Sequence, residues 1–331
     1  MKKQILTALL FVSATLFFVA CETDKPKGND NKPIKIKVDA PKFNSDNAYK
    51  YIEQQLAFGP RVPGSKGHDS CAAWLETTLN SFGATVTVQK AEVSGGSKKY
   101  NIKNIIASFN PSAAQRILLC AHWDTRSMAD QDSERKNEPI PGADDGGSGV
   151  AVLMEIARTL GETKLKNIGV DIVLFDAEDQ GDSGNSFKRE SWCLGAQYWS
   201  KNPHVPNYKA NFGVLLDMVG ARGARFPKEG VSMKHASFYV DKIWNTAMEQ
   251  GFSDFFQNRE ERQIVDDHLF VNEIRKIPTV DIIHLSQDSP TGFGSHWHTH
   301  KDNIDIISKS SLLAVGQTLL QVLFEEDAPV K

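Results

Sequence analysis

Four short runs of aliphatic and β-branched residues recur along the chain, and His, Asp or Glu follows each of them closely. The runs occupy residues 117–121, 172–175, 212–216 and 279–283. They are continuously apolar and do not alternate with polar residues, which is typical of strands that are buried on both faces of a sheet. The runs therefore predict the interior strands of a sheet with both faces covered.

Segments with helical periodicity separate and flank these runs. Apolar residues recur at helix spacing after Ser148, and Gly161 is expected just past the end of that helix. Residues 71–82, followed by Gly83, and residues 312–324 show the same pattern. Because strands alternate with helices, the sequence predicts an α/β fold. We expect one three-layer domain with a mixed, mostly parallel central sheet and helices on both faces.

Polar residues at the ends of the predicted strands are the first candidates for a functional site. In such folds, ligands bind beyond the carboxyl ends of the strands. The side chains expected there are those of His122, Asp124, Glu178, Asp179 and Asp217. Acidic residues also follow strands simply because the chain has reached solvent. However, carboxylates and imidazoles are normal zinc ligands, and several strand ends carry only these types.

A glycine-rich segment, residues 141–149, lies between the first two runs and contains Asp144 and Asp145. It lacks the lysine of a phosphate-binding loop. Its glycines are expected to let the backbone turn tightly, so that a carboxylate points into the site. His298 is a further candidate ligand. No HExxH motif is present, which argues against the zincin architecture.

The first residues predict export. Lys2 and Lys3 precede a nearly unbroken apolar run that ends at Ala20, which is the pattern of a signal peptide over residues 1–20. The ending before Cys21 resembles a bacterial lipobox, and this resemblance implies that Cys21 is acylated; ordinary cleavage is the alternative. We expect residues 21–43 to be a flexible tether and residues 44–331 the catalytic domain. The expected location is the bacterial cell envelope, as a periplasm-facing or surface lipoprotein with only its lipid in the membrane.

Charge and cysteine content narrow the possible partners. The formal net charge is −3 and no basic cluster stands out, so nucleic acid is not an expected partner. Cys71, Cys120 and Cys193 permit at most one disulfide among themselves, and the sequence leaves open which pair would form it.

Five motifs together resemble the zinc aminopeptidase and glutaminyl cyclase superfamily, and bacterial glutaminyl cyclases in particular. They are HWD at residues 122–124, PGADDGGSGVA at 141–151, FDAED at 175–179, LLDMVG at 215–220 and WHTHKDN at 297–303. The resemblance covers roughly residue 51 to the C-terminus. It implies a zinc aminopeptidase-like fold in which Asp145, Asp179 and His298 bind zinc and Glu178 acts as general acid and base. Asp145 is preferred to Asp144 because its spacing to Glu155 fits the cyclase pattern.

The superfamily resemblance leaves two chemistries open. In the aminopeptidases two zinc ions activate a water, and His122 and Asp217 are the residues available for a second ion, with Asp124 as a further candidate near it. Cyclisation needs one zinc, because the nucleophile is the substrate's own α-amine. It also favours a pocket that excludes water. Trp192, Phe293 and Trp297 are the expected walls of that pocket; the alternative for each aromatic residue is packing in the core.

Residues 265–268, a Val-Asp-Asp-His segment, resemble a second cyclase feature. The resemblance implies that Asp266 joins Asp217 in a hydrogen-bonded acidic group beside Glu178; an acidic helix N-terminus is the alternative. Two departures from animal cyclases are present. Asp179 replaces a glutamate, and the position of a pocket histidine is taken by Asp281, with His284 three residues later. The long stretch from His284 to Trp297 is interpreted as a bacterial variation at the pocket rim.

These observations predict a glutaminyl-peptide cyclotransferase, an acyltransferase that converts N-terminal Gln to pyroglutamate with release of ammonia and contains one Zn2+ per chain. The expected substrates are peptides or proteins with N-terminal Gln. A zinc aminopeptidase is the first alternative. A non-catalytic peptide-binding lipoprotein of the envelope is the second.

Overall fold

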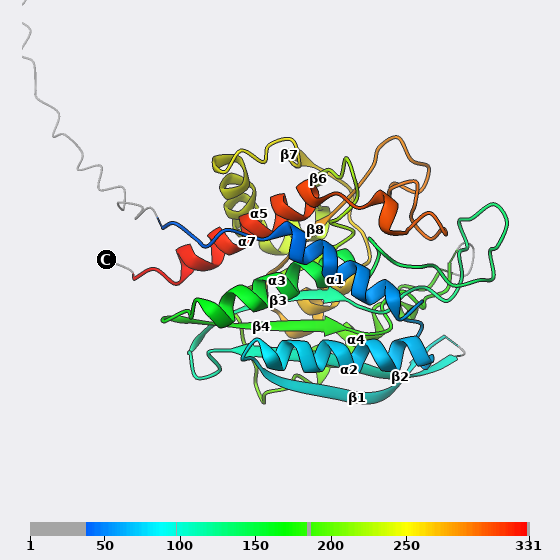
Figure 1. Ribbon diagram of the computed structural model, residues 1–331, viewed down its shortest axis with the longest axis horizontal. Coiled ribbons are helices and arrows are strands. Elements are labelled where there is room, and N and C mark those ends of the chain that lie inside the picture. The colour runs from blue at the N-terminus through cyan, green and yellow to red at the C-terminus, as the bar shows by residue number, and fades with distance from the viewer. Residues whose placement is uncertain (1–37, 97, 184–186, 330–331) are drawn as a thin grey trace, which may run out of the picture. The chain divides into compact units, whose positions relative to one another are not determined.

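A mixed six-stranded sheet forms the centre of the fold in the computed structural model, which describes residues 38–96, 98–183 and 187–329 (Figure 1). The strand order is β1-β2-β4-β3-β5-β8. The four predicted runs form neighbouring parallel strands, which confirms them: β3 (Gln115–His122), β4 (Ile168–Phe175), β5 (Phe212–Asp217) and β8 (Thr279–Ile283). The predicted signal peptide, Cys21 and most of the predicted tether lie outside the described residues.

Two further strands were not foreseen from the hydrophobic pattern. β1 (Thr85–Gly95) and β2 (Lys98–Phe109) are antiparallel to each other, and β2 is antiparallel to β4. Side chains of β1 alternate between exposed and half-buried positions along most of its length. A strand at the sheet edge with one solvated face does not need a continuous apolar run, so the pattern that revealed the interior strands missed this one.

Helices cover both faces of the sheet, as predicted. The α-helices are α1 (Ser45–Ala57), α2 (Lys66–Ser81), α3 (Ser148–Glu162), α4 (Leu194–Lys201), α5 (Gly230–Glu249), α6 (Asp267–Phe270) and α7 (Lys309–Glu326). The remaining elements are the short helices η2 (Arg189–Ser191), η3 (Val271–Arg275) and η4 (Ile304–Ile306), and a parallel pair of strands, β6 (Phe226–Lys228) and β7 (Phe256–Glu260).

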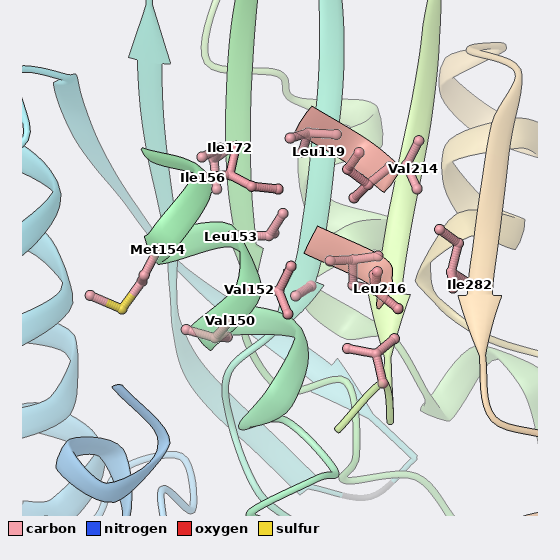
Figure 2. Packing of buried hydrophobic residues seen from close by; sticks show 14 of the residues in the cluster. Leu119, Val150, Val152, Leu153, Met154, Ile156, Ile172, Val214, Leu216 and Ile282 are labelled. Carbon is pink, nitrogen blue, oxygen red and sulfur yellow. The ribbon is translucent and has the colours of Figure 1, made fainter. Parts of the chain in front are cut away.

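Alternate residues of β3 enter different cores. Leu119 belongs to the larger core, which contains side chains of α1, α2, α3, α5 and α7. Leu118 and Cys120 belong to a second core, with side chains of α4 and η3. Figure 2 shows the larger core, where Val152 and Leu153 of α3 lie against the sheet. Burial on both faces explains why β3 is apolar at every position.

The end of α3 differs slightly from the prediction. Gly161 lies inside the last turn of the helix, which ends at Glu162. A Cβ on Gly161 would lie 2.1 Å from the carbonyl oxygen of Phe82. Glycine is therefore required for the close approach of two backbones, and it does not terminate the helix.

The three cysteines of the described part of the chain are free and buried, so no disulfide joins Cys71, Cys120 and Cys193. Among the described residues, no helix is both long and apolar enough to cross a membrane.

Candidate metal centre and active site

The carboxyl ends of β3, β4 and β5 bring three predicted site segments together. His122 is the last residue of β3 and lies in register with Phe175, the last residue of β4. The loop after β4 carries Glu178 and Asp179, and Asp217 ends β5. Parallel neighbours end at one edge of the sheet, so residues far apart in sequence converge there.

The first cluster contains Asp145, Asp179 and His298, whose ligand atoms all lie within 4.8 Å of one another. His298 Nε2 is 3.0 Å from Asp179 Oδ1 and 3.7 Å from Asp145 Oδ2. Ligand atoms around one tetrahedral zinc lie about 3.3 Å apart, given bonds of about 2 Å. All three side chains are buried, and Oδ2 of each aspartate has no hydrogen-bond partner. Buried carboxylate oxygens without partners are costly unless a cation lies among them, so this cluster fits a zinc ion.

The second cluster shares Asp145 with the first. His122 Nε2 lies 3.1 Å from Asp145 Oδ1 and 3.1 Å from Asp217 Oδ1. Burial, together with the negative charges of Asp266 and Asp145, raises the pKa of Asp217 to about 7 even though His122 opposes the shift. The geometry of this cluster also fits one metal ion, so the two clusters could hold two ions with Asp145 between them.

A carboxylate behind His298 fixes the orientation of its ring. His298 Nδ1 is 3.0 Å from Asp130 Oδ1, and Arg126 holds Asp130 through two hydrogen bonds. A histidine ligand usually donates its second nitrogen in this way. Burial disfavours the imidazolium, yet the charges of Asp179 and Asp130 raise the pKa of His298 to about 9. The site therefore strongly favours a positive charge at this position.

The structure distinguishes Asp145 from Asp144. The Asp144 carboxylate contacts His296 Nε2 at 2.9 Å and accepts a hydrogen bond from the Gly220 amide at 2.7 Å, so both of its oxygens are occupied. The Asp302 carboxylate accepts hydrogen bonds from the backbone amides of Asp144 and Asp145 at 2.7 and 3.2 Å. This arrangement leaves only Asp145 facing the two clusters.

Two features shape the glycine-rich loop next to this site. Gly146 has a φ of +77°, and a Cβ there would lie 2.2 Å from the Asp124 carbonyl oxygen. Arg61 is fully buried and donates hydrogen bonds to the carbonyl groups of Trp123, Pro141 and Gly142 at 3.2, 2.8 and 2.7 Å. The loop is therefore tied to the end of β3, which carries His122.

Asp124 supports the site and belongs to neither cluster. Its carboxylate accepts hydrogen bonds from the amides of Glu178 and Asp179 at 2.9 and 3.4 Å and from Gln180 Nε2 at 3.0 Å. It lies 3.7 Å from His122 Nδ1. Asp124 therefore orients the residues around the metal centre.

Glu178 lies next to the metal clusters with its side chain nearly buried. Its Oε1 accepts a hydrogen bond from the Cys193 thiol at 3.3 Å, and Asp266 is within 4.8 Å. Burial and the charges of Asp179 and Asp266 raise the pKa of Glu178 well above its usual range. The preceding Ala177 has a φ of +52°, a strained conformation of the kind found at functional sites.

Asp266 lies beside Glu178 and lines the same pocket as Asp217, whose pKa its negative charge helps to raise. Asp217 also contacts His122, and Asp266 caps α6 by accepting a hydrogen bond from the Asp267 amide. Asp266 is thus the N-cap that the acidic-helix alternative describes, but its Oδ2 has no hydrogen-bond partner, so an acidic group of Asp266 with Asp217 stays a prediction.

Aromatic side chains form the walls of a pocket of about 430 Å³ at the metal clusters. Its lining includes Asp145, Glu178, Asp179, Asp217, Asp266, His298, Trp192, Phe293 and Trp297. Trp297 stacks on His298 with ring centroids 3.7 Å apart, and Phe293 lies 4.7 Å from Trp297. Trp192 is nearly parallel to His298 at 6.3 Å. The three predicted wall residues are thus brought together at one pocket.

Neither candidate for the polar partner of this pocket lines it. Asp281 is fully buried and lies 3.5 Å from His268 Nδ1, away from the pocket lining. His284 is half-buried and lines a different cavity. The polar groups that do line the aromatic pocket, besides its acidic residues and His298, are Gln131, Ser183, Arg262 and Gln263.

Sequence reasoning missed several supporting residues. Asp130, Arg126 and Arg61 lie in segments without a recognisable motif, so no local signal pointed to them. Asp302 lies within the WHTHKDN segment and His296 directly precedes it, so their positions next to a motif are a local signal for both residues. Their partners, however, lie more than 150 positions away, and only the fold connects them.

The fold and site define a zinc-dependent α/β enzyme of the aminopeptidase type. Residues 104–323 match Peptidase family M28, and the chain belongs to this family.

The solved glutaminyl cyclase of Tannerella forsythia is 48% identical to this chain and has a TM-score of 0.84 against it. The match covers 86% of this chain and 99% of the Tannerella forsythia chain. A Zn-dependent exopeptidase from Parabacteroides distasonis is 46% identical with the same coverage and TM-score. The glutaminyl-peptide cyclotransferase of Drosophila melanogaster is 25% identical over 275 residues, covering 75% of this chain and 72% of that protein. The similar proteins therefore include both an exopeptidase and glutaminyl cyclases, so similarity alone does not decide between these two activities.

Proposed function

We propose that the protein is a glutaminyl-peptide cyclotransferase. The observation that carries this proposal is the aromatic pocket at the first metal cluster, where Trp297 stacks on His298 and Glu178 lies in the lining. The volume of about 430 Å³ is in the range of small-ligand sites and suits a glutamine side chain with its backbone. Asp145, Asp179 and His298 would hold the zinc ion.

The chain's own residues account for most of the reaction. The bound zinc would polarise the γ-carbonyl of the substrate glutamine. Glu178 takes a proton from the α-ammonium group, and the freed amine attacks the carboxamide carbon. A new carbon–nitrogen bond closes the ring, Glu178 returns the proton to the amide nitrogen, and the bond to that nitrogen breaks as ammonia leaves. The second proton that the ring nitrogen loses passes through Glu178 to the ammonia, which departs as ammonium. A carboxyl group whose pKa is raised by burial is suited to both steps.

The aromatic walls have two tasks. They hold the flexible glutamine side chain folded, so that amine and carboxamide carbon are close enough to react. They also exclude water, whose attack would give glutamate. Asp266 lies beside Glu178, and its negative charge helps to raise the pKa of Glu178, which makes the Glu178 carboxylate a stronger base toward the α-ammonium group.

Aminopeptidase activity is the second candidate, and one observation favours it. The cluster of His122, Asp145 and Asp217 has ligand spacing for a second ion, and a pair of ions is suited to activating a water.

Product analysis and zinc content separate the two candidates. A cyclase incubated with a Gln-initiated peptide releases ammonia and leaves the peptide at full length, with one zinc per chain. A matched peptide beginning with Ala should give no product. Release of free N-terminal amino acid, together with two zinc ions per chain, would replace the proposal by the aminopeptidase.

The proposed location follows from the N-terminal sequence. A lipid on Cys21 and a flexible tether would hold the enzyme in the bacterial cell envelope, where exported proteins are processed and expose new N-termini. Membrane fractionation of the full chain and of a Cys21→Ser variant tests this. The variant should lose the lipid-dependent membrane association.

A further inference from the structure

A second cavity, of about 810 Å³, lies against the aromatic pocket. Gln131 and Trp297 line both cavities, so the Trp297 side chain is part of the wall between them. The remaining lining comes from residues 221–225, 257–259 and 284–299. The last of these segments follows β8, is drawn in orange in Figure 1, and is the stretch that the sequence distinguishes from animal cyclases.

The lining of this cavity is cationic. It contains Arg222, Arg225 and Arg259 but only one carboxylate, that of Asp288. Arg259 is paired with Glu261. Arg225 donates hydrogen bonds to the carbonyl groups of Gly223 and Ala224 and has no acidic partner among the described residues. The Arg222 side chain is exposed and contacts no described hydrogen-bonding or acidic group. Two guanidinium groups are therefore available for a ligand.

His284 adds a donor to the same lining. Its Nδ1 accepts a hydrogen bond from the Arg225 amide at 2.8 Å, so the proton of the neutral ring lies on Nε2. The two guanidinium groups and the imidazole N–H are hydrogen-bond donors, and Asp288 is the one carboxylate of the lining. Donors of this kind form short, strong hydrogen bonds with carboxylates, and arginine can do so with both arms of its fork.

We propose that this cavity is a subsite for the substrate residues that follow the N-terminal one, and that it selects acidic side chains. The proposal rests on the proposed function only for the N-terminal residue that occupies the aromatic pocket. An extended peptide advances about 3.3–3.6 Å per residue, so the second to fourth residues extend past the shared Trp297 wall. The cavity volume accommodates such a segment.

A peptide series measures this selection directly. Peptides that begin with Gln carry Glu, Gln or Lys at the second to fourth positions, and ammonia and free amino acid are both recorded. We expect a KM about fivefold lower for the Glu series than for the Gln series, with kcat nearly unchanged, because the contacts are made equally in ground and transition states. The Lys series should have the highest KM. Added salt should reduce the differences.

Variants assign the selection to the cavity. Arg222→Gln should remove most of the preference for Glu while leaving the neutral series unchanged, and Arg222→Glu should reverse it in favour of Lys. Arg135→Gln is the matched control, because Arg135 is exposed, has Glu138 as its one acidic partner among the described residues and lines neither cavity. Equal KM values for the three series would overturn the proposal, as would a preference that survives in Arg222→Glu.

Binding to a turnover-blocked form keeps this test separate from the proposed function. Calorimetry of the zinc-loaded Glu178→Gln variant with the same peptides measures affinity without reaction. Tighter binding of the Glu series supports the subsite even if the wild-type protein releases amino acids and no ammonia, which would refute only the cyclase. Equal affinities for all three series refute the subsite even if ammonia is released.

Discussion

The two ligand clusters share Asp145 but differ in what lies behind their histidines. His298 has a carboxylate at hydrogen-bond distance behind its ring, because Asp130 is 3.0 Å from Nδ1. His122 has only a distant one, because Asp124 is 3.7 Å from its Nδ1, which has no hydrogen-bond partner. The ligand atoms are thus similarly spaced in the two clusters, but only His298 has a carboxylate at hydrogen-bond distance from its second ring nitrogen. Since such support governs the orientation and basicity of a ligand, the first cluster is better prepared for a metal ion.

The second cluster differs also in its acidic neighbour. Burial and nearby carboxylates raise the pKa of Asp217 to about 7, so near neutral pH a proton competes with a metal ion for this carboxylate. We therefore expect the His298 cluster to dominate zinc binding.

Removal of His298 should have the largest effect. His298→Ala leaves two buried carboxylates without their imidazole ligand, so zinc and all measurable activity should be lost together. Zinc content by atomic absorption and the ammonia assay check this. His300→Ala is the control, since His300 contacts Asp132 and belongs to neither cluster; it should keep both properties. A His298→Ala protein that is folded and retains one zinc would reverse the ranking of the clusters.

Glu178→Gln should slow turnover by about 10²–10⁴-fold, the usual contribution of a positioned acid–base group. Zinc content should stay unchanged, because Glu178 is not part of either ligand cluster. The exposed Glu190 provides the matched substitution Glu190→Gln, which should behave as wild type. Retained activity in Glu178→Gln would remove its role as proton carrier.

Asp130→Asn tests the support of His298 alone. The amide retains the size of the carboxylate but not its charge, so zinc affinity should fall about 10–100-fold. Chelator competition gives this affinity, and excess zinc should restore turnover. A protein with unchanged zinc affinity would show that the contact behind His298 is not what distinguishes the clusters.

His122→Gln should have the smallest effect on metal. If only the first cluster is filled, the variant should still bind one zinc per chain, with an affinity within about threefold of wild type. A fall from two zinc ions to one would show that both clusters are filled and would favour the aminopeptidase.

The hydrophobic pattern was sufficient for the four parallel strands β3, β4, β5 and β8, because they are buried on both faces and need continuous apolar residues. The same pattern was silent on β1, whose solvated face permits polar residues. The site residues also fall into two groups, those that lie in a sequence motif and those that do not. Glu178 and His298 lie in motifs, whereas Asp130 was unpredictable because its role arises from a contact across 168 positions.

The sequence by itself determined the four parallel strands, the ligand types near the ends of three of them and, through the resemblance, the superfamily. The resemblance also favoured Asp145 over Asp144 as the ligand. Only the tertiary structure decided that Asp144 is bonded to His296, that Asp281 and His284 lie outside the aromatic pocket, and that a cationic cavity adjoins it. The physical reason is that periodicity and motif order report local preferences along the chain. The environment of a charged side chain depends instead on which distant segments pack around it.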